Sequence, residues 1–253
     1  MNIRLSYIII SWNGLHLLQQ LLSSMQKQLA RDDVEVWIVD NGSTDETLNF
    51  VRNHYPDIHL IRLNENKGVA YARNRALEKA HGDYLLILDN DIVVSDEAIA
   101  GMEQYMDAHP QTGLCACRLT GKDGKVQESC KDYPGLGSKI KSLWFGNRPR
   151  PFRYADEIQA GEPFEPVYVI GACQMIRRKA LEEVGLLDEN IFYGPEDCDY
   201  CLRMQQAGWK VMYLPKYALQ HLCQRKTTRH PFSALGRKHI RALMYFYRKY
   251  RRI

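Results

Sequence analysis

The chain has 253 residues, of which 45% are hydrophobic and 25% are charged, and its formal net charge is +4. This length fits one large domain, or one domain with an appendage, and the composition is ordinary for a soluble globular protein. The mild positive charge does not indicate nucleic acid as a partner, and we expect none.

Strands and helices alternate in the first part of the chain. Apolar runs rich in β-branched residues predict strands at 5–11, 34–40, 58–64 and 83–89. Apolar residues at helical spacing predict helices at 15–29, 45–54, 69–80 and 95–109, the last capped by Ser95. This alternation favours a parallel α/β sheet, in which ligands bind at the carboxyl ends of strands. Three of those ends read SWNG, VDNGSTD and LDND.

The later part of the chain is less regular. Gly and Pro are dense from 114 to 166, so we interpret this segment as a loop-rich insertion. A strand is predicted at 167–178 and a helix at 179–184, and a last short strand, YALQH, ends at His221.

The seven cysteines form no disulfide framework, and a reducing cytosol is the simplest interpretation. Cys198-x-x-Cys201 has no second such pair and falls in a helical pattern, so we interpret it as packing. The N-terminus becomes polar too soon for a signal peptide, and no apolar run reaches the ~18 residues of a membrane span. We therefore expect a cytoplasmic protein that is not integral to a membrane.

Asp89 and Asp91 follow the apolar run YLLIL and stand one residue apart. Like charges this close repel at the end of a buried strand, and a divalent cation beside a phosphate would resolve the conflict. Mg²⁺ and Mn²⁺ both favour carboxylate oxygens. The alternative, favoured for such a motif in isolation, is that the pair occupies a solvated turn before the next helix.

Three further positions could have a functional role, and each also has a purely structural interpretation. Asp40 ends a strand and would accept from a base N–H or a ribose hydroxyl, or cap an Asx-turn. Glu196-Asp197 starts a helix and would supply a general base, or complement the helix dipole. His221 would be a third metal ligand only together with the two aspartates. Phosphate-binding candidates, or a solvated basic loop, follow it: Arg225, Lys226 and Arg229.

The order and spacing of these segments strongly resemble the family 2 inverting glycosyltransferases, and most closely their bacterial rhamnosyltransferase-like branch. The resemblance covers about residues 5–225 and rests on SWNG, VDNGSTD, NENKGVAYARNRAL, YLLILDND, VIGACQMIRRKALEEVG and EDCDYCLRMQQAGW. It implies the GT-A fold, a Rossmann-like, mostly parallel sheet flanked by helices. We assign that domain to 1–230, with the 114–166 insertion on the acceptor side.

The resemblance also implies site residues. It assigns nucleotide binding to Ile10, Ser11, Trp12, Asp40, Gly68, Arg73 and Asn90. It assigns substrate binding to Gly171, Ala172, Glu196 and Arg225, metal binding to Asp89, Asp91 and His221, and the catalytic base to Asp197. Trp12 stands where the family often has a stacking tyrosine. The segment after His221 departs from the longer, Ser-rich segment of the family, which weakens the role of Arg225.

The activity implied is one-step, inverting transfer of a hexose or deoxyhexose, dependent on Mn²⁺ or Mg²⁺. The donor would be a nucleotide-diphosphate sugar, a UDP- or dTDP-sugar first of all. The acceptor would be a glycan or lipid-linked glycan in the synthesis of bacterial surface polysaccharide or lipopolysaccharide.

The C-terminal segment 231–253 is basic and predicts an amphipathic helix, with apolar residues at i, i+3, i+4 and i+7 from Ile240. Such a helix either lies on an anionic membrane, here the inner face of the cytoplasmic membrane, or packs on the core and shows its charges to water. The sequence leaves both open.

Two other functions compete with sugar transfer. A nucleotidyltransferase would also use a nucleotide, a metal and paired aspartates, but SWNGLHLL lacks the Gly-rich basic loop expected after its first strand. A non-catalytic sugar- or nucleic-acid-binding module is allowed by the basic tail, but it does not need carboxylates at strand and helix ends.

Overall fold

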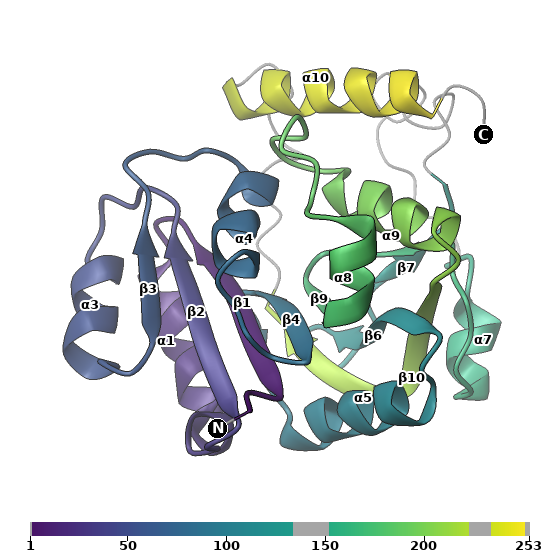
Figure 1. Ribbon diagram of the computed structural model, residues 1–253, viewed down its shortest axis with the longest axis horizontal. Helices are drawn as coiled ribbons and strands as arrows, with labels where there is room; N and C mark the ends of the chain where they lie inside the picture. The colour runs from purple at the N-terminus through teal and green to yellow at the C-terminus, as the bar shows by residue number, and fades with distance from the viewer. Residues whose placement is uncertain (1, 134–151, 223–233, 251–253) are drawn as a thin grey trace.

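The computed structural model describes residues 2–133, 152–222 and 234–250 (Figure 1). Its main sheet has eight strands in the order β3-β2-β1-β4-β9-β6-β10-β5. These strands are β1 Leu5–Ser11, β2 Val34–Asp40, β3 His59–Arg62, β4 Tyr84–Asp89, β5 Ile92–Val93, β6 Thr112–Thr120, β9 Cys173–Arg177 and β10 Lys210–His221. A second, two-stranded sheet pairs β7 Cys130–Lys131 with β8 Tyr168–Val169.

Helices cover both faces of the main sheet. They are α1 Leu15–Ser24, α2 Gln26–Leu29, α3 Thr47–His54, α4 Val69–Leu77, α5 Asp96–Ala108, α7 Ala155–Ala160, α8 Arg178–Val184, α9 Glu196–Gln206 and α10 Ala234–Lys249. Side chains alternate along each strand, so Ile8 and Ile87 pack in one apolar cluster with α4, α8, α9 and α10. Tyr7 and Ile9 face the opposite cluster, which contains residues of α1, α3 and α5. The sheet is therefore buried on both sides, as its near-continuous apolar strands predict.

The parallel half of the sheet brings distant strand ends to one edge. β1 pairs in parallel with both β2 and β4, and β2 with β3. In this register Ser11 lies opposite Asp40, and Ile10 lies opposite Asp89. The predicted convergence of the polar strand ends at one edge is confirmed.

The other half of the sheet differs from the expected parallel arrangement. β9 runs antiparallel to both β4 and β6, and β5 runs antiparallel to β10. Strand direction depends on a connection between elements, which an apolar run such as VYVIGACQMIRR does not encode. The whole is a mixed, mostly parallel α/β sheet.

Three segment boundaries are corrected. The loop-rich segment does not begin at 114, because the apolar run up to Thr120 completes β6; the dense glycines begin only at Gly121. The predicted helix at 15–29 breaks at Met25 into α1 and α2. The predicted strand at 167–178 is interrupted between β8 and β9, where a Cβ on Gly171 would stand only 2.6 Å from Arg73 Nη1.

The helix α10 packs on the core with one face. Ala242, Phe246 and Tyr250 are buried there, and Lys249 Nζ lies 2.7 Å from carboxylate oxygens of both Asp188 and Asp199. Met244 is 52% exposed on its outer face. Within the described ranges no helix combines the length and the apolarity needed to cross a membrane. The packing alternative is thus observed, while the outer face stays open to solvent.

Cys198 and Cys201 are buried in the apolar cluster under α9, which confirms the packing interpretation of that pair.

Candidate active site

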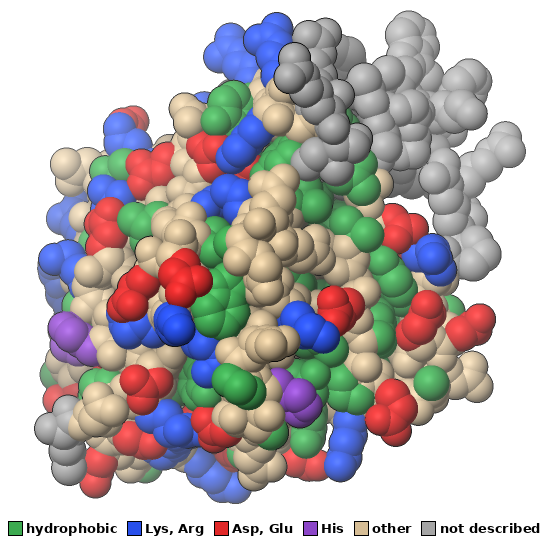
Figure 2. Space-filling model, turned by 45° about the vertical axis from the view of Figure 1, so that its right-hand side comes forward, with side chains coloured by type: hydrophobic (Ala, Val, Ile, Leu, Met, Phe, Trp, Pro, Cys, Tyr) green, Lys and Arg blue, Asp and Glu red, His purple; other side chains and the backbone are tan. Residues whose placement is uncertain are grey.

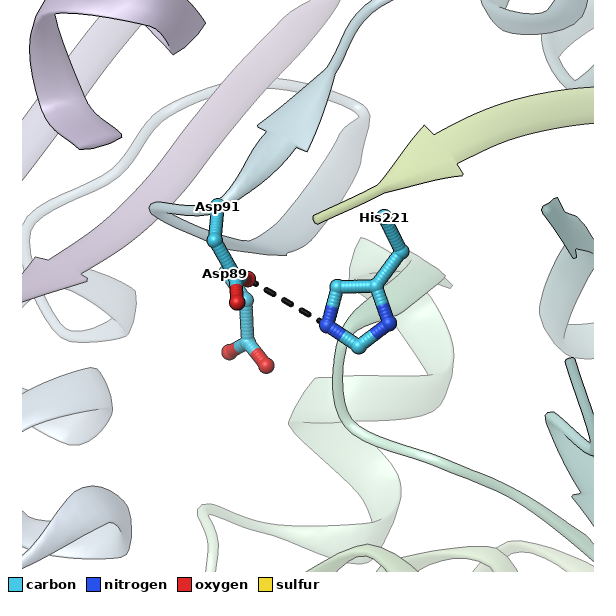
Figure 3. Close-up of side chains that lie close together, drawn as sticks. All are labelled: Asp89, Asp91 and His221. Atoms are coloured by element: carbon cyan, nitrogen blue, oxygen red, sulfur yellow. Dashed lines mark ion pairs between the residues drawn. The ribbon is translucent and has the colours of Figure 1, made fainter. Parts of the chain in front are cut away.

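A cluster of Asp89, Asp91 and His221 forms where three strands meet (Figure 3). Asp89 ends β4, Asp91 lies in the turn before β5, and His221 ends β10. One ligand atom from each residue lies within 4.8 Å of the others, and His221 Nε2 is 3.3 Å from Asp91 Oδ1. The antiparallel pairing of β10 with β5, which sets His221 opposite Ile92, brings the histidine to the aspartates. The structure thus unites the three predicted metal ligands.

The charges of this cluster suit a cation. Burial, reinforced by the charge of Asp91, raises the pKa of Asp89, although Arg73 and His221 oppose this. Burial alone would lower the pKa of His221, but its hydrogen bond to Asp91 and the charges of both aspartates raise it overall. Two carboxylates and one imidazole supply the oxygen and nitrogen ligands that a divalent metal of the Mn²⁺ type accepts.

Arg73, from α4, is buried and turned toward the same cluster. One of its Nη atoms donates to Asp89 Oδ1 and to the Gly171 carbonyl, each at 2.8 Å. Its other Nη atom lies 3.6 Å from Glu196 Oε1. Arg73 therefore partly neutralises the carboxylates, and the nucleotide contact expected of it stays a prediction.

The start of α9 presents the Glu196-Asp197 pair. Asp197 accepts hydrogen bonds from the Cys198 N–H at 2.7 Å and from the Gly171 N–H at 3.3 Å, which orient its carboxylate. Burial, with the charge of Asp197, raises the pKa of Glu196 to about 7. Glu196 Oε2 is buried and has no hydrogen-bond partner among the described residues. The neighbouring carboxylates thus differ, with Asp197 held by backbone and Glu196 enclosed.

A cavity of about 210 Å³ joins the metal cluster to α9. It is lined by Arg73, Asp89, Gly171, Ala172, Glu196, Asp197 and His221, among others. The Ala172 carbonyl accepts from the Asp89 N–H at 3.1 Å, so the turn before β9 is tied to the end of β4. All of the predicted metal, base and substrate residues except Asp91 and Arg225 line this cavity, and Asp91 lines the adjoining one. Arg225 lies outside the described residues.

A second cavity, of about 220 Å³, adjoins the first and shares Val69, Asp89 and Tyr193 with it. Its lining includes the predicted nucleotide residues Ile10, Ser11, Trp12, Gly68 and Asn90. Trp12 lines this cavity and is 47% exposed. Asn90 Nδ2 donates to Ser11 Oγ at 3.1 Å, which joins the ends of β4 and β1.

Of the predicted nucleotide residues, Arg73 lines only the first cavity, and Asp40 lines neither. Only 1% of Asp40 is exposed. Both of its carboxylate oxygens accept from the Ser43 N–H at 3.3 Å, as in the turn alternative. Its contact with a base therefore stays a prediction.

Asn41 lines this cavity and was missed from the sequence. Its side chain donates to the Gly68 carbonyl at 3.3 Å and accepts from the Lys67 N–H at 3.0 Å. It thereby holds the loop before α4 against the end of β2. Its place beside Asp40 in VDNGSTD, at the end of a predicted strand, is the signal that could have found it.

Solved structures with the same architecture are GT-A glycosyltransferases, which confirms the predicted fold. The mannosyltransferase PcManGT from Pyrobaculum calidifontis, in complex with GDP-Man and Mn²⁺, aligns with a TM-score of 0.68 at 21% identity. That alignment covers 100% of this chain and 65% of the other. GalNAc-T7 with UDP, GalNAc and Mn²⁺ aligns with a TM-score of 0.66 at 18% identity, over 97% of this chain and 50% of that one. The chain thus spans about two thirds of the first structure and half of the second.

The chain belongs to glycosyl transferase family 2, whose family model matches residues 6–185. The N-acetylglucosaminyl-diphospho-decaprenol L-rhamnosyltransferase of Mycobacterium tuberculosis is 28% identical over 240 residues, 88% of this chain and 77% of that protein. The dTDP-rhamnosyl transferase RfbF of Shigella flexneri is 26% identical over 227 residues, 87% of this chain and 70% of that protein. Rhamnosyltransferases thus stand among its relatives, as the resemblance predicted.

Proposed function

We propose that this protein transfers a sugar from a nucleotide-diphosphate donor to a hydroxyl acceptor, with inversion and with a divalent cation. The main observation behind this proposal is that Asp89, Asp91, His221 and Asp197 line two adjoining cavities. Family membership favours this function over a nucleotidyltransferase or a binding module.

The donor nucleotide would occupy the cavity beside Trp12. The exposed indole offers a stacking surface for the base, and Ser11 and Asn90 offer polar groups for the ribose. The diphosphate would then reach the acidic cluster, where Asp89, Asp91 and His221 would hold Mn²⁺ or Mg²⁺. A bound cation would neutralise the charge that develops on the departing diphosphate. The imidazole nitrogen and the Mn²⁺ of the structural neighbours make Mn²⁺ the first ion to test.

The acceptor would enter beside Asp197, which we propose as the general base. A carboxylate oriented by two backbone N–H groups is suited to take the acceptor proton as the new bond forms. One base acting in one displacement inverts the anomeric carbon. Arg73 and the turn at Gly171 would keep Asp89 and Asp197 on facing walls of the cavity.

The names of two relatives direct the choice of substrates. One is a dTDP-rhamnosyl transferase, and another acts on N-acetylglucosaminyl-diphospho-decaprenol. We therefore propose a dTDP- or UDP-sugar, dTDP-rhamnose first, and a glycan or lipid-linked acceptor of bacterial surface polysaccharide synthesis.

The outer face of α10 supports contact with an anionic membrane on the cytoplasmic side. Arg241, Met244 and Arg248 are exposed at i, i+3 and i+7, and Lys and Arg side chains stand out at the top of the molecule, where α10 lies (Figure 2). His239 donates to the Tyr193 carbonyl at 2.9 Å, which places this helix beside the cavities. Binding to vesicles with and without anionic lipid tests this point; equal binding to both would exclude it.

The function is tested by thermal stabilisation with UDP, dTDP, GDP and CDP, each with and without Mn²⁺. A ligand that binds only the folded state raises its stability by mass action. We expect a shift with UDP or dTDP that depends on Mn²⁺ and disappears in Asp91→Asn. A rise in melting temperature that is the same with and without Mn²⁺, or no rise with any nucleotide, would contradict the proposal.

A further inference from the structure

Gln127 makes two hydrogen bonds to His221 although 94 residues separate them. The segment after β6 turns back on it, with Val126 bridging to Thr120 and the Gln127 N–H donating to the Leu119 carbonyl at 2.8 Å. β6 and β10 are neighbours in the sheet, so this return segment sets the Gln127 side chain beside the end of β10. Its position is thus fixed by backbone pairing.

The two bonds determine which way the Gln127 amide points. Nε2 donates to the His221 backbone carbonyl at 2.9 Å, and a carbonyl can only accept. The amide oxygen, Oε1, must then face His221 Nδ1, which lies 2.7 Å away. Because Oε1 can only accept, Nδ1 carries a proton in both the charged and the neutral ring.

This proton assignment decides what the other ring nitrogen can do. In a neutral imidazole with its proton on Nδ1, Nε2 has a free lone pair. His221 Nε2 faces the aspartates, 3.3 Å from Asp91 Oδ1 (Figure 3). A metal ion needs this tautomer and this ring orientation, and ligating histidines commonly donate their second N–H to a fixed acceptor.

We propose that Gln127 is a positioning residue that holds His221 as the Nδ1–H tautomer, with Nε2 aimed at the metal site. The inference rests on the proposed metal-dependent function and adds to it a residue outside the ligand set. Gln127 does not touch the donor or the acceptor in this scheme; it acts only through His221.

The experiment compares Gln127→Leu, Gln127→Glu and the unmodified protein, with Glu128→Gln as the matched control on the same segment. Glu128 is exposed. The first readout is Mn²⁺ affinity without nucleotide. The second is the ¹⁵N spectrum of the His221 ring in metal-free protein at alkaline pH, identified by its loss in His221→Ala.

We expect Gln127→Leu to bind Mn²⁺ on the order of 10- to 100-fold more weakly, the range typical of lost outer-shell partners. Its ring spectrum should lose the pure Nδ1–H signature. Gln127→Glu keeps an oxygen facing Nδ1 but loses the donor to the His221 carbonyl, so it should retain that signature and lose less affinity than Gln127→Leu, while Glu128→Gln should retain both. Where the Leu variant folds poorly, the Glu variant provides the test: loss of the Nδ1–H signature despite an acceptor at Nδ1 would overturn the role of Gln127.

The outcomes separate two failures. Unchanged Mn²⁺ affinity and an unchanged tautomer in Gln127→Leu would overturn the role of Gln127 alone. Absence of Mn²⁺ binding in the unmodified protein, both alone and with dTDP or UDP, would overturn the metal-dependent function and this inference with it.

Discussion

Two charged clusters lie at opposite edges of the same sheet, and they are balanced differently. Near the amino ends of β1 and β4, the carboxylates of Asp33, Glu103 and Asp107 meet Arg4 and Arg31 at 2.5–2.9 Å. At the carboxyl ends, Glu196 comes only within 3.6 Å of Arg73, and Asp197 has no ion-pair partner among the described residues. Asp89, Asp91, Glu196 and Asp197 share the cavity region with Arg73 and His221.

The difference shows which cluster holds the fold together and which is prepared for a ligand. In the first, each carboxylate has a direct arginine partner. In the second, burial raises the pKa of Glu196 to about 7, and its Oε2 lacks a partner within the described part of the chain. Uncompensated acidic groups in a cavity are costly for folding alone, so their presence there favours a role in binding and catalysis.

The largest effect is expected from removing the base. Asp197→Asn should lower kcat by on the order of 10²- to 10⁴-fold, because the acceptor hydroxyl loses its proton acceptor. Nucleotide affinity in the presence of Mn²⁺ should stay unchanged, since Asp197 does not line the cavity beside Trp12. Sugar transfer and nucleotide titration measure the two quantities. Turnover near that of the unmodified protein would exclude Asp197 as the base.

In the cluster around Arg4 and Arg31, a substitution should lower stability and leave metal binding unchanged. Glu103 is 5% exposed and accepts from both Arg4 and Arg31, so Glu103→Gln should cost about 3 kcal/mol of unfolding free energy. Mn²⁺ affinity should not change. Chemical denaturation and metal titration test this, with the exposed Glu97→Gln on the same helix as control. A loss of Mn²⁺ affinity without a loss of stability would break the contrast between the two edges.

The metal should supply the charge balance that the catalytic edge lacks. At a Mn²⁺ concentration of about 100 times Kd, the unmodified protein should gain about 2.7 kcal/mol of stability. Asp91→Asn should gain almost none. Without metal the variant should match the unmodified protein, because the lost His221 contact and the relieved repulsion from Asp89 offset each other. Denaturation with and without Mn²⁺ measures this, and equal stabilisation of both proteins would refute it.

Several acidic positions of this candidate site could be predicted from the residues alone because their signals are local, while their roles were implied by the family resemblance. Asp89 and Asp91 follow an apolar run, and Glu196 and Asp197 follow a Gly-Pro turn. Each pair can therefore be recognised from the few residues around it. Parallel strand order then brings Ser11, Asp40 and Asp89 to one edge. These positions could be derived before any coordinates.

What the sequence could not predict depends on pairing over long distances. Gln127 meets His221 only because β6 and β10 are neighbours in the sheet, and nothing in KVQESC indicates that partner. Arg73 was expected to bind the nucleotide, which stays a prediction, but nothing in NENKGVAYARNRAL indicates that its guanidinium also donates to Asp89 and to the Gly171 carbonyl. The basic tail likewise carried two equal interpretations until the contacts of Lys249 showed which face packs.

The smallest effect is expected at Asp188, whose carboxylate is paired with side chains of α10. Asp188 accepts from Lys249 Nζ at 2.7 Å and from the Tyr245 hydroxyl at 2.9 Å. Burial alone would raise the pKa of Asp188, but these bonds and those from Asn190 lower it to about 2. Because the folded-state pKa lies below the unfolded one, the stabilisation is present above about pH 4 and is lost as pH falls toward 2.

Asp188→Asn should therefore cost on the order of 1 kcal/mol at pH 7, a value reduced for solvent screening, and almost nothing near pH 2. Unfolding measured over this pH range, with the exposed Glu162→Gln as control, provides the test. A pH-independent cost would mean that Asp188 acts through shape and not charge. An unchanged stability at pH 7 would show that α10 is held by its apolar face, with Phe246 buried beneath it, and that its ion pairs contribute nothing measurable.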